Sequence, residues 1–222
     1  SGAIRLTLND SVLETAVNIS GSASSTGSFG VLQLDYYNGG VGANTNTWYG
    51  YTAGNSITSG ERNVALGYES LTSLTTGDDN MAIGYYAGQV LADRSNNTFV
   101  GNFAGRYVSG SGNVAIGKDA LIGGVTSGDY SAVQNNVAIG QDALTKIETG
   151  DDNVAIGVNA GFDITSGQRT VLIGRNAGTN LTTTSGTIAI GYKALEDAVD
   201  GVGDNSIVIG NFAGNNITQM DS

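Results

Sequence analysis

The sequence predicts an all-β protein, a parallel β-solenoid or β-roll built from about ten 17-residue coils. Three observations support this fold class: a phrase that returns at a fixed period, many glycines without proline, and a strand-like alternation inside each copy. The 222 residues include 35 Gly and no Pro, and 40% of them are hydrophobic. Glycine supplies the turns of a regular ladder, whereas proline would remove N–H groups that the ladder needs.

One glycine in each copy defines the repeat. The phrase "GDDNMAIGYYAG" at Gly77 to Gly88 returns as "GDDNVAIGVNAG" at Gly150 to Gly161. Aligned on the glycine of "AIG", the sequence holds ten copies, and six of the nine spacings have the same length as the first one. A period repeated this often is typical of solenoids, whose units bury their apolar faces against their neighbours. The ten glycines are Gly50, Gly67, Gly84, Gly101, Gly117, Gly140, Gly157, Gly174, Gly191 and Gly210.

Each coil is predicted to contain two short strands and two turns. In "NVAIG" the alternation puts Val154 and Ile156 on one face and Ala155 on the other, and we expect the larger Val and Ile to point inward. A second apolar position follows the glycine by seven residues, at Ile57, Leu74, Leu91, Val108, Ile147, Ile164 and Leu181. The asparagine that opens a copy is expected to stack as a ladder, at Asn63, Asn80, Asn97, Asn113, Asn136 and Asn153.

Composition excludes several classes of function. The chain has no His and no Cys, so it lacks the side chains of His-based triads, thiolate or imidazole zinc sites and disulfides. The net charge of −11 disfavours binding to nucleic acid, which rests on clustered Lys and Arg. No apolar run is long enough to cross a bilayer as a helix, so we expect no membrane insertion. We further expect no enzyme activity, no cofactor and no metal.

The phrase "NVAIG-x-x-A", repeated from Thr47 to Gly214, resembles the head repeat of YadA-like trimeric autotransporter adhesins. The resemblance implies a left-handed parallel β-roll assembled as a homotrimer, although the 17-residue period is longer than the adhesin coil. The segment Asn18 to Asp35 looks more like bacteriophage tail fibres, in which Ser/Thr/Gly-rich stretches precede such repeats. We therefore divide the chain into an N-terminal β leader or capping segment, 1–45, and a repeat domain, 46–222.

The resemblance implies a structural and adhesive segment of a phage tail fibre, located in the virion and attaching to a host glycan or protein receptor. Two alternatives remain open at this point. One is a tailspike that degrades polysaccharide, and the other is the head of a bacterial adhesin at the cell surface.

Three sets of residues are candidates for a site. Tyr51, Tyr68 and Tyr85 each follow a repeat glycine and should form one aromatic ladder able to stack against a sugar chain. The spacing from Gly117 to Gly140 exceeds 17 by six, so Gly123 to Asn135 should bulge as a loop that offers Asp129 and Tyr130. The pairs Asp78-Asp79 and Asp151-Asp152 invite an acid/base or calcium interpretation, but turns beside Gly favour Asp for local reasons.

Overall fold

The computed structural model describes residues 45–126, 129–198, 204–215 and 217. The predicted leader, 1–45, lies outside these residues apart from its last position, so it stays a prediction. Within the described ranges the chain is all-β, with strands and turns and no helix. The predicted fold class, a parallel β-solenoid whose successive strands lie about one repeat apart in the sequence, is confirmed.

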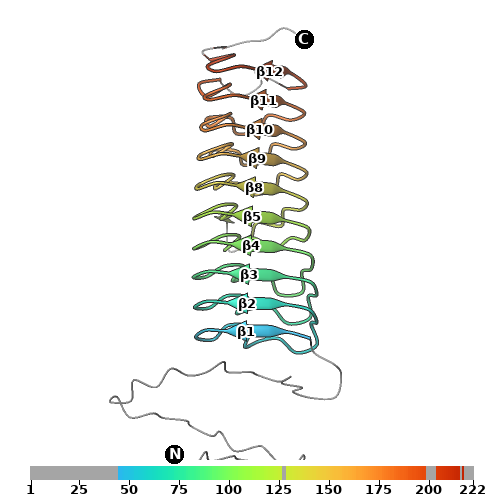
Figure 1. The fold of residues 1–222 in the computed structure, drawn as a ribbon. Coiled ribbons are helices and arrows are strands. Elements are labelled where there is room, and N and C mark those ends of the chain that lie inside the picture. The colour runs from blue at the N-terminus through green and yellow to red at the C-terminus, as the bar shows by residue number, and fades with distance from the viewer. Residues whose placement is uncertain (1–44, 127–128, 199–203, 216, 218–222) are drawn as a thin grey trace, which may run out of the picture. The chain divides into compact units, whose positions relative to one another are not determined.

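Ten three-residue strands stack into one parallel sheet (Figure 1). Equivalent residues lie opposite each other, so that Val64 pairs with Met81 and Ala65 with Ala82. A separate antiparallel pair, β6 with β7, interrupts the chain between β5 and β8. The strands are β1 Thr47–Tyr49, β2 Val64–Leu66, β3 Met81–Ile83, β4 Thr98–Val100, β5 Val114–Ile116, β6 Val125–Thr126, β7 Asp129–Tyr130, β8 Val137–Ile139, β9 Val154–Ile156, β10 Val171–Ile173, β11 Ile188–Ile190 and β12 Ile207–Ile209.

The repeat glycine ends each strand of the main sheet because the backbone there has no room for a side chain. All ten glycines have φ between 130° and 141°, a region that L-residues rarely adopt. A Cβ on Gly157 would lie only 2.5 Å from the carbonyl oxygen of Gly174 in the next coil. The glycine column is therefore where successive coils come closest, which explains why the sequence repeats this residue.

The strand facing predicted from the sequence is wrong. Ala155 is fully buried, whereas Val154 and Ile156 are half-buried on the outer face of the sheet. The same pattern holds in the other central strands, where the middle residue points inward and its two neighbours point outward. The inner strand position holds a small alanine in most coils, and the β-branched residues on either side of it lie on the outer face.

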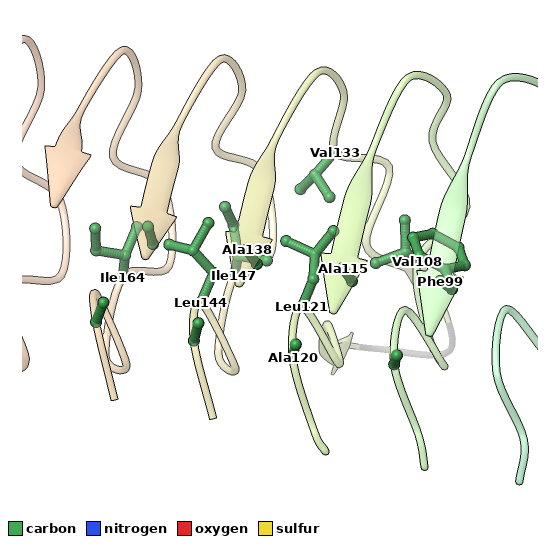
Figure 2. Packing of buried hydrophobic residues seen from close by; sticks show 14 of the residues in the cluster. Phe99, Val108, Ala115, Ala120, Leu121, Val133, Ala138, Leu144, Ile147 and Ile164 are labelled. Atoms are coloured by element: carbon green, nitrogen blue, oxygen red, sulfur yellow. The ribbon is translucent and has the colours of Figure 1, made fainter. Parts of the chain in front are cut away.

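Two positions share the interior of each coil, and no described coil has a large residue at both. The central strand residue shares the core with the residue four positions after the repeat glycine, where the sequence alternates between Gly and Leu. Where the strand residue is large, as at Phe99 or Leu172, the later position is Gly105 or Gly178. A Cβ on Gly105 would lie 2.6 Å from the Phe99 ring. Figure 2 shows the opposite arrangement, in which Ala115 precedes Leu121 and Ala138 precedes Leu144.

The second apolar position completes the core. The residues predicted there are fully buried from Leu74 to Leu181, and Ile57 is partly buried against the same cluster. The second strand predicted in each coil is not found among the described residues; only an isolated bridge joins Val108 to Ser131. Instead, single backbone hydrogen bonds such as Thr75 N to Ala92 O hold this side of the coils together. The turns are too tight for a continuous ladder to form.

The shared interior predicts a compensating pair of substitutions. We expect Leu172→Ala to lower the free energy of unfolding by about 2–5 kcal/mol because it leaves a cavity. Gly178→Leu alone should cost about 1–3 kcal/mol, since its Cβ would lie 2.9 Å from Leu172 Cδ2. The double variant should be more stable than either single variant, because the leucine introduced at position 178 fills the cavity left at position 172. Leu144 shows that leucine can adopt the positive φ required at this point of the coil. Urea unfolding of the four proteins measures the coupling, and strictly additive losses would contradict the shared interior.

Candidate binding surface

Three tyrosines stack along the turn that follows the main sheet. The ring centroids of Tyr51 and Tyr68 lie 5.2 Å apart with an interplanar angle of 15°, and those of Tyr68 and Tyr85 lie 5.2 Å apart at 25°. The sequence predicted this column from the identical positions in successive coils. Because the rings stack on one another, the faces of Tyr68 are engaged by its neighbours. The column therefore presents ring edges and hydroxyl groups to solvent, which is a poor arrangement for a sugar to stack along its length.

A second aromatic column lies beside the first, one residue further along each turn. Tyr86 and Phe103 stack at 6.0 Å with nearly parallel rings, and Tyr86 meets Tyr85 edge to face at 4.3 Å. Phe103 also meets Tyr85 edge to face, at 5.3 Å. The two columns thus form one continuous aromatic strip over the coils of β1 to β4.

Arg106 closes the end of this strip. Its guanidinium carbon lies 4.5 Å from the ring centroid of Tyr86, 5.0 Å from that of Phe103 and 4.7 Å from that of Tyr107. Arg106 forms no ion pair with any described carboxylate. Cation–π attraction to three rings therefore holds the guanidinium in place.

Polar side chains run alongside the rings. Arg106 Nε donates to Gln89 Oε1 at 3.1 Å, and Gln89 Nε2 donates to Glu69 Oε2 at 2.9 Å. The carboxylate of Glu69 also hydrogen-bonds the Tyr68 hydroxyl, and this bond, with burial as the second cause, raises the pKa of Tyr68. A hydrogen bond to Tyr85, followed by burial, raises the pKa of Tyr86 to about 12. These hydroxyl groups are thus fixed by the network around them.

The inserted residues form a short antiparallel pair of strands. Val125 pairs with Tyr130 and Thr126 with Asp129. The predicted loop, Gly123 to Asn135, is shorter than expected, because Ser131 and Val133 are buried in the coil. Ser131 Oγ donates to the carbonyl oxygen of Ile147 at 2.9 Å and accepts from Gly124 N at 2.7 Å. The backbone of Asp129 lies in β7, and its side chain is outside the described part of the structure.

Tyr130 joins the inserted pair to the aromatic strip. Its ring lies parallel to that of Tyr107, with centroids 6.3 Å apart and an interplanar angle of 3°. Tyr107 in turn contacts Arg106, which contacts Tyr86 and Phe103. The tyrosine ladder and Tyr130, which were predicted as separate candidate sites, therefore belong to one surface.

Arg106, Tyr107 and Gln89 were not predicted from the sequence. They lie five or six residues after the repeat glycine, outside the positions whose repetition defines the coils. A column-by-column alignment of all 17 positions would have shown that aromatic and cationic residues gather in the same few coils.

The asparagine ladder is structural. Each described Asn accepts from the backbone N–H of its successor, as Asn136 Oδ1 does from Asn153 N at 2.9 Å. Its amide nitrogen donates to a backbone carbonyl of the next coil, as Asn136 Nδ2 does to Gly150 O at 3.0 Å. Thr170 ends the ladder by donating from Oγ1 to Asn153 Oδ1 at 2.7 Å. Every amide is buried and hydrogen-bonded, so no ligand is needed to satisfy the column.

The paired carboxylates also serve the turns. Asp78 Oδ1 accepts from Glu61 N and Asp151 Oδ1 from Gln134 N, both at 2.7 Å. Arg62 Nε donates to Asp79 Oδ1 at 2.6 Å, and this bond is the main reason that the pKa of Asp79 is lowered. Among the described residues, no three or more acidic side chains come together in a group able to hold a metal ion.

The fold and this surface define a parallel β-solenoid that carries an aromatic strip and an inserted strand pair on a repetitive scaffold. Comparison of the chain with protein-family models, with curated proteins and with solved structures finds no match. In the part of the chain that the structure describes, no helix is long and apolar enough to cross a membrane.

The tyrosine network predicts a loss of stability at alkaline pH. Because the pKa of Tyr86 is raised from 10.0 to about 12, its stabilising effect is complete below the unfolded value and is lost as pH rises through the folded value. Thermal melts between about pH 9 and pH 12 should show a midpoint that falls less steeply in Tyr86→Phe than in the parent. Tyr192→Phe, far along the stack, is the control and should follow the parent. Identical profiles for parent and Tyr86→Phe would contradict this role.

Proposed function

We propose that the chain is a structural and adhesive segment of a bacteriophage tail fibre, assembled as a homotrimer in the virion and attaching it to the host cell surface. The observation that supports this proposal is the outer face of the main sheet. This face consists of the first and third residues of each strand, which are apolar with few exceptions, and none of them is charged. A solenoid of this kind fits fibre and adhesin-like structural proteins.

The apolar face needs a partner with the same repeat. Ile139, Ile156 and Ile173 lie in one in-register column, with Val137, Val154 and Val171 beside them. A second copy of the chain presents the same columns at the same spacing, so it matches this face along its whole length. Exposed apolar patches of such extent are uncommon on monomers and mark interaction surfaces.

Charge favours the same assembly. Each copy carries a net charge of −11, so the three copies of a trimer carry three times −11, or −33. Copies therefore repel one another unless they meet through uncharged surface. The outer face of the main sheet is such a surface, and acidic turn residues such as Asp78 and Asp151 lie outside the strands.

The turn carboxylates argue for a structural segment over a polysaccharide-degrading enzyme. Asp78 and Asp151 both accept hydrogen bonds from backbone N–H groups of the preceding coil. A glycoside hydrolase needs two carboxyl groups that face a shared substrate cleft, one of them protonated. Carboxylates that satisfy backbone donors in separate turns do not support that chemistry, and we propose a function without catalysis.

The proposed interface predicts that Ile156→Asp yields a monomer. The substitution places a charge in the middle of the outer apolar face, where burying it between copies costs several kcal/mol. Sedimentation equilibrium of the parent should give three times the chain mass of 22.5 kDa, and the variant should give the chain mass with its β-sheet circular dichroism retained. Val158→Asp, in the turn two residues later, is the matched control and should remain a trimer. A monomeric parent would refute the assembly.

The proposed location has its own test. Antibodies raised against the chain are expected to label the tails of phage particles in electron micrographs. Labelling of the surface of uninfected bacteria would instead indicate the adhesin alternative.

A further inference from the structure

Two of the three departures from the 17-residue spacing adjoin each other at one place on the solenoid. The 16-residue spacing from Gly101 to Gly117 and the 23-residue spacing from Gly117 to Gly140 adjoin each other. The inserted β6–β7 pair lies within the longer of these two coils. Arg106, which has no described ion-pair partner, contacts Tyr107 immediately before the bridge to the inserted residues.

Two short segments present their side chains outward at this place. Val108 and Ser131 form a parallel bridge and point into the core. The residues on either side of Ser131, namely Tyr130 and Ala132, are exposed, and Tyr107 and Ser109 occupy the matching positions one coil earlier. Tyr107 therefore stacks with Tyr130 on the outside of the solenoid. Ser109 and Ala132 form the matching pair directly beside these two rings.

A polar hollow lies next to these stacked rings. Arg94 donates from Nε to the carbonyl oxygen of Ser109 at 2.6 Å and forms an ion pair with Asp93 at 3.4 Å. Neither Nη group of Arg94 has a hydrogen-bond partner among the described residues. The residues that line the hollow are Arg94, Ser109, Gly110, Ser111, Ala132 and Gln134.

The rest of the chain shows that the fold does not require these side chains. The coils of β8 to β11 repeat the order of large and small core residues found in those of β2 to β5, with Leu71 matched by Leu144 and Phe99 by Leu172. On the surface, however, Asn180 occupies the position of Tyr107, and Thr179 that of Arg106. The same strands form in both sets of coils, so the aromatic and cationic residues of the first set are available for binding.

We propose that Tyr130 and the adjoining hollow bind a neutral glycan. This inference rests on the proposed attachment function and names the class of ligand. Tyr130 is 46% exposed, and no described aromatic ring covers the face that points away from Tyr107. An aromatic face that is open at the end of a stack accepts the apolar face of a sugar ring, which the middle of the Tyr51–Tyr85 column cannot do.

The hollow provides the hydrogen-bonding groups that would contact the hydroxyl groups of the glycan. Ser109 and Ser111 carry hydroxyl groups, Gln134 carries an amide, and Arg94 offers only donors. Mixed donors and acceptors match sugar hydroxyl groups, which both donate and accept. A polyanionic glycan fits less well, because Asp93 already pairs with Arg94 and the net charge of the chain is −11.

The test measures binding of the full chain to polysaccharides by affinity electrophoresis in native gels. The neutral probes are dextran, mannan, galactan and a soluble β-glucan, and the acidic probes are alginate and polygalacturonate. We expect at least one neutral polysaccharide to retard the parent. Tyr130→Ala should weaken that retardation about tenfold, whereas Tyr130→Phe should retain it because the ring remains.

Tyr192→Ala is the matched control, since Tyr192 is similarly exposed at 38% but lies in the coil of β11. Retardation by no neutral probe, retardation by the acidic probes alone, or equal retardation of parent and Tyr130→Ala would each overturn the proposed site. Sedimentation equilibrium of the same samples reports the trimer separately. A trimer that binds no neutral glycan would therefore refute this site and leave the proposed fibre assembly standing.

Discussion

The close approach of one repeat glycine to the next fixes the rest of this structure. The repeat glycine has no side chain and a φ near +135°, so its Cα can lie against the carbonyl group of the repeat glycine in the next coil. Gly157 and Gly174 show this contact. That contact sets the register, so the strands pair residue for residue and every side chain lies above its counterpart. The narrow interior, the asparagine ladder and the stacked tyrosines all follow from this single repeated contact.

Stacking in register also determines which polar groups the interior can hold. A buried amide is costly when its hydrogen bonds are incomplete. The Asn80 side chain, however, donates from Nδ2 to Asn63 Oδ1 in one neighbouring coil and accepts at Oδ1 from Asn97 N in the other. The column changes to Thr170 without leaving its last asparagine unsatisfied. A solenoid can therefore bury a polar column, because each member supplies what the next one lacks.

The repeat was sufficient to predict the fold class, since a fixed period can be buried only by stacking. The repeat could not predict which face of "VAI" lies inside. Alternation assigns the residues to two faces, but it does not indicate how large a side chain the interior of the coil accepts. The Gly-or-Leu variation after the repeat glycine held that information. Leu144 fills the space beside Ala138, and Gly178 leaves room for Leu172. The tyrosine column was predictable for the same reason as the fold. Its connection through Arg106 and Tyr107 to Tyr130 depended on the inserted strand pair, whose path the period does not determine.

The matching cores of the coils of β2 to β5 and β8 to β11 have a consequence for how such a chain arises. Gly77 and Gly150 begin equivalent turns 73 positions apart, and between them the order of large and small core residues completes one full cycle. Duplication of such a four-coil block adds length without creating a new junction, because the last coil of one block already fits the first coil of the next. Each copy is then free to diverge on its surface while its core stays constant. A solenoid of this design can lengthen in whole blocks and change the surface of one block while the other maintains the scaffold.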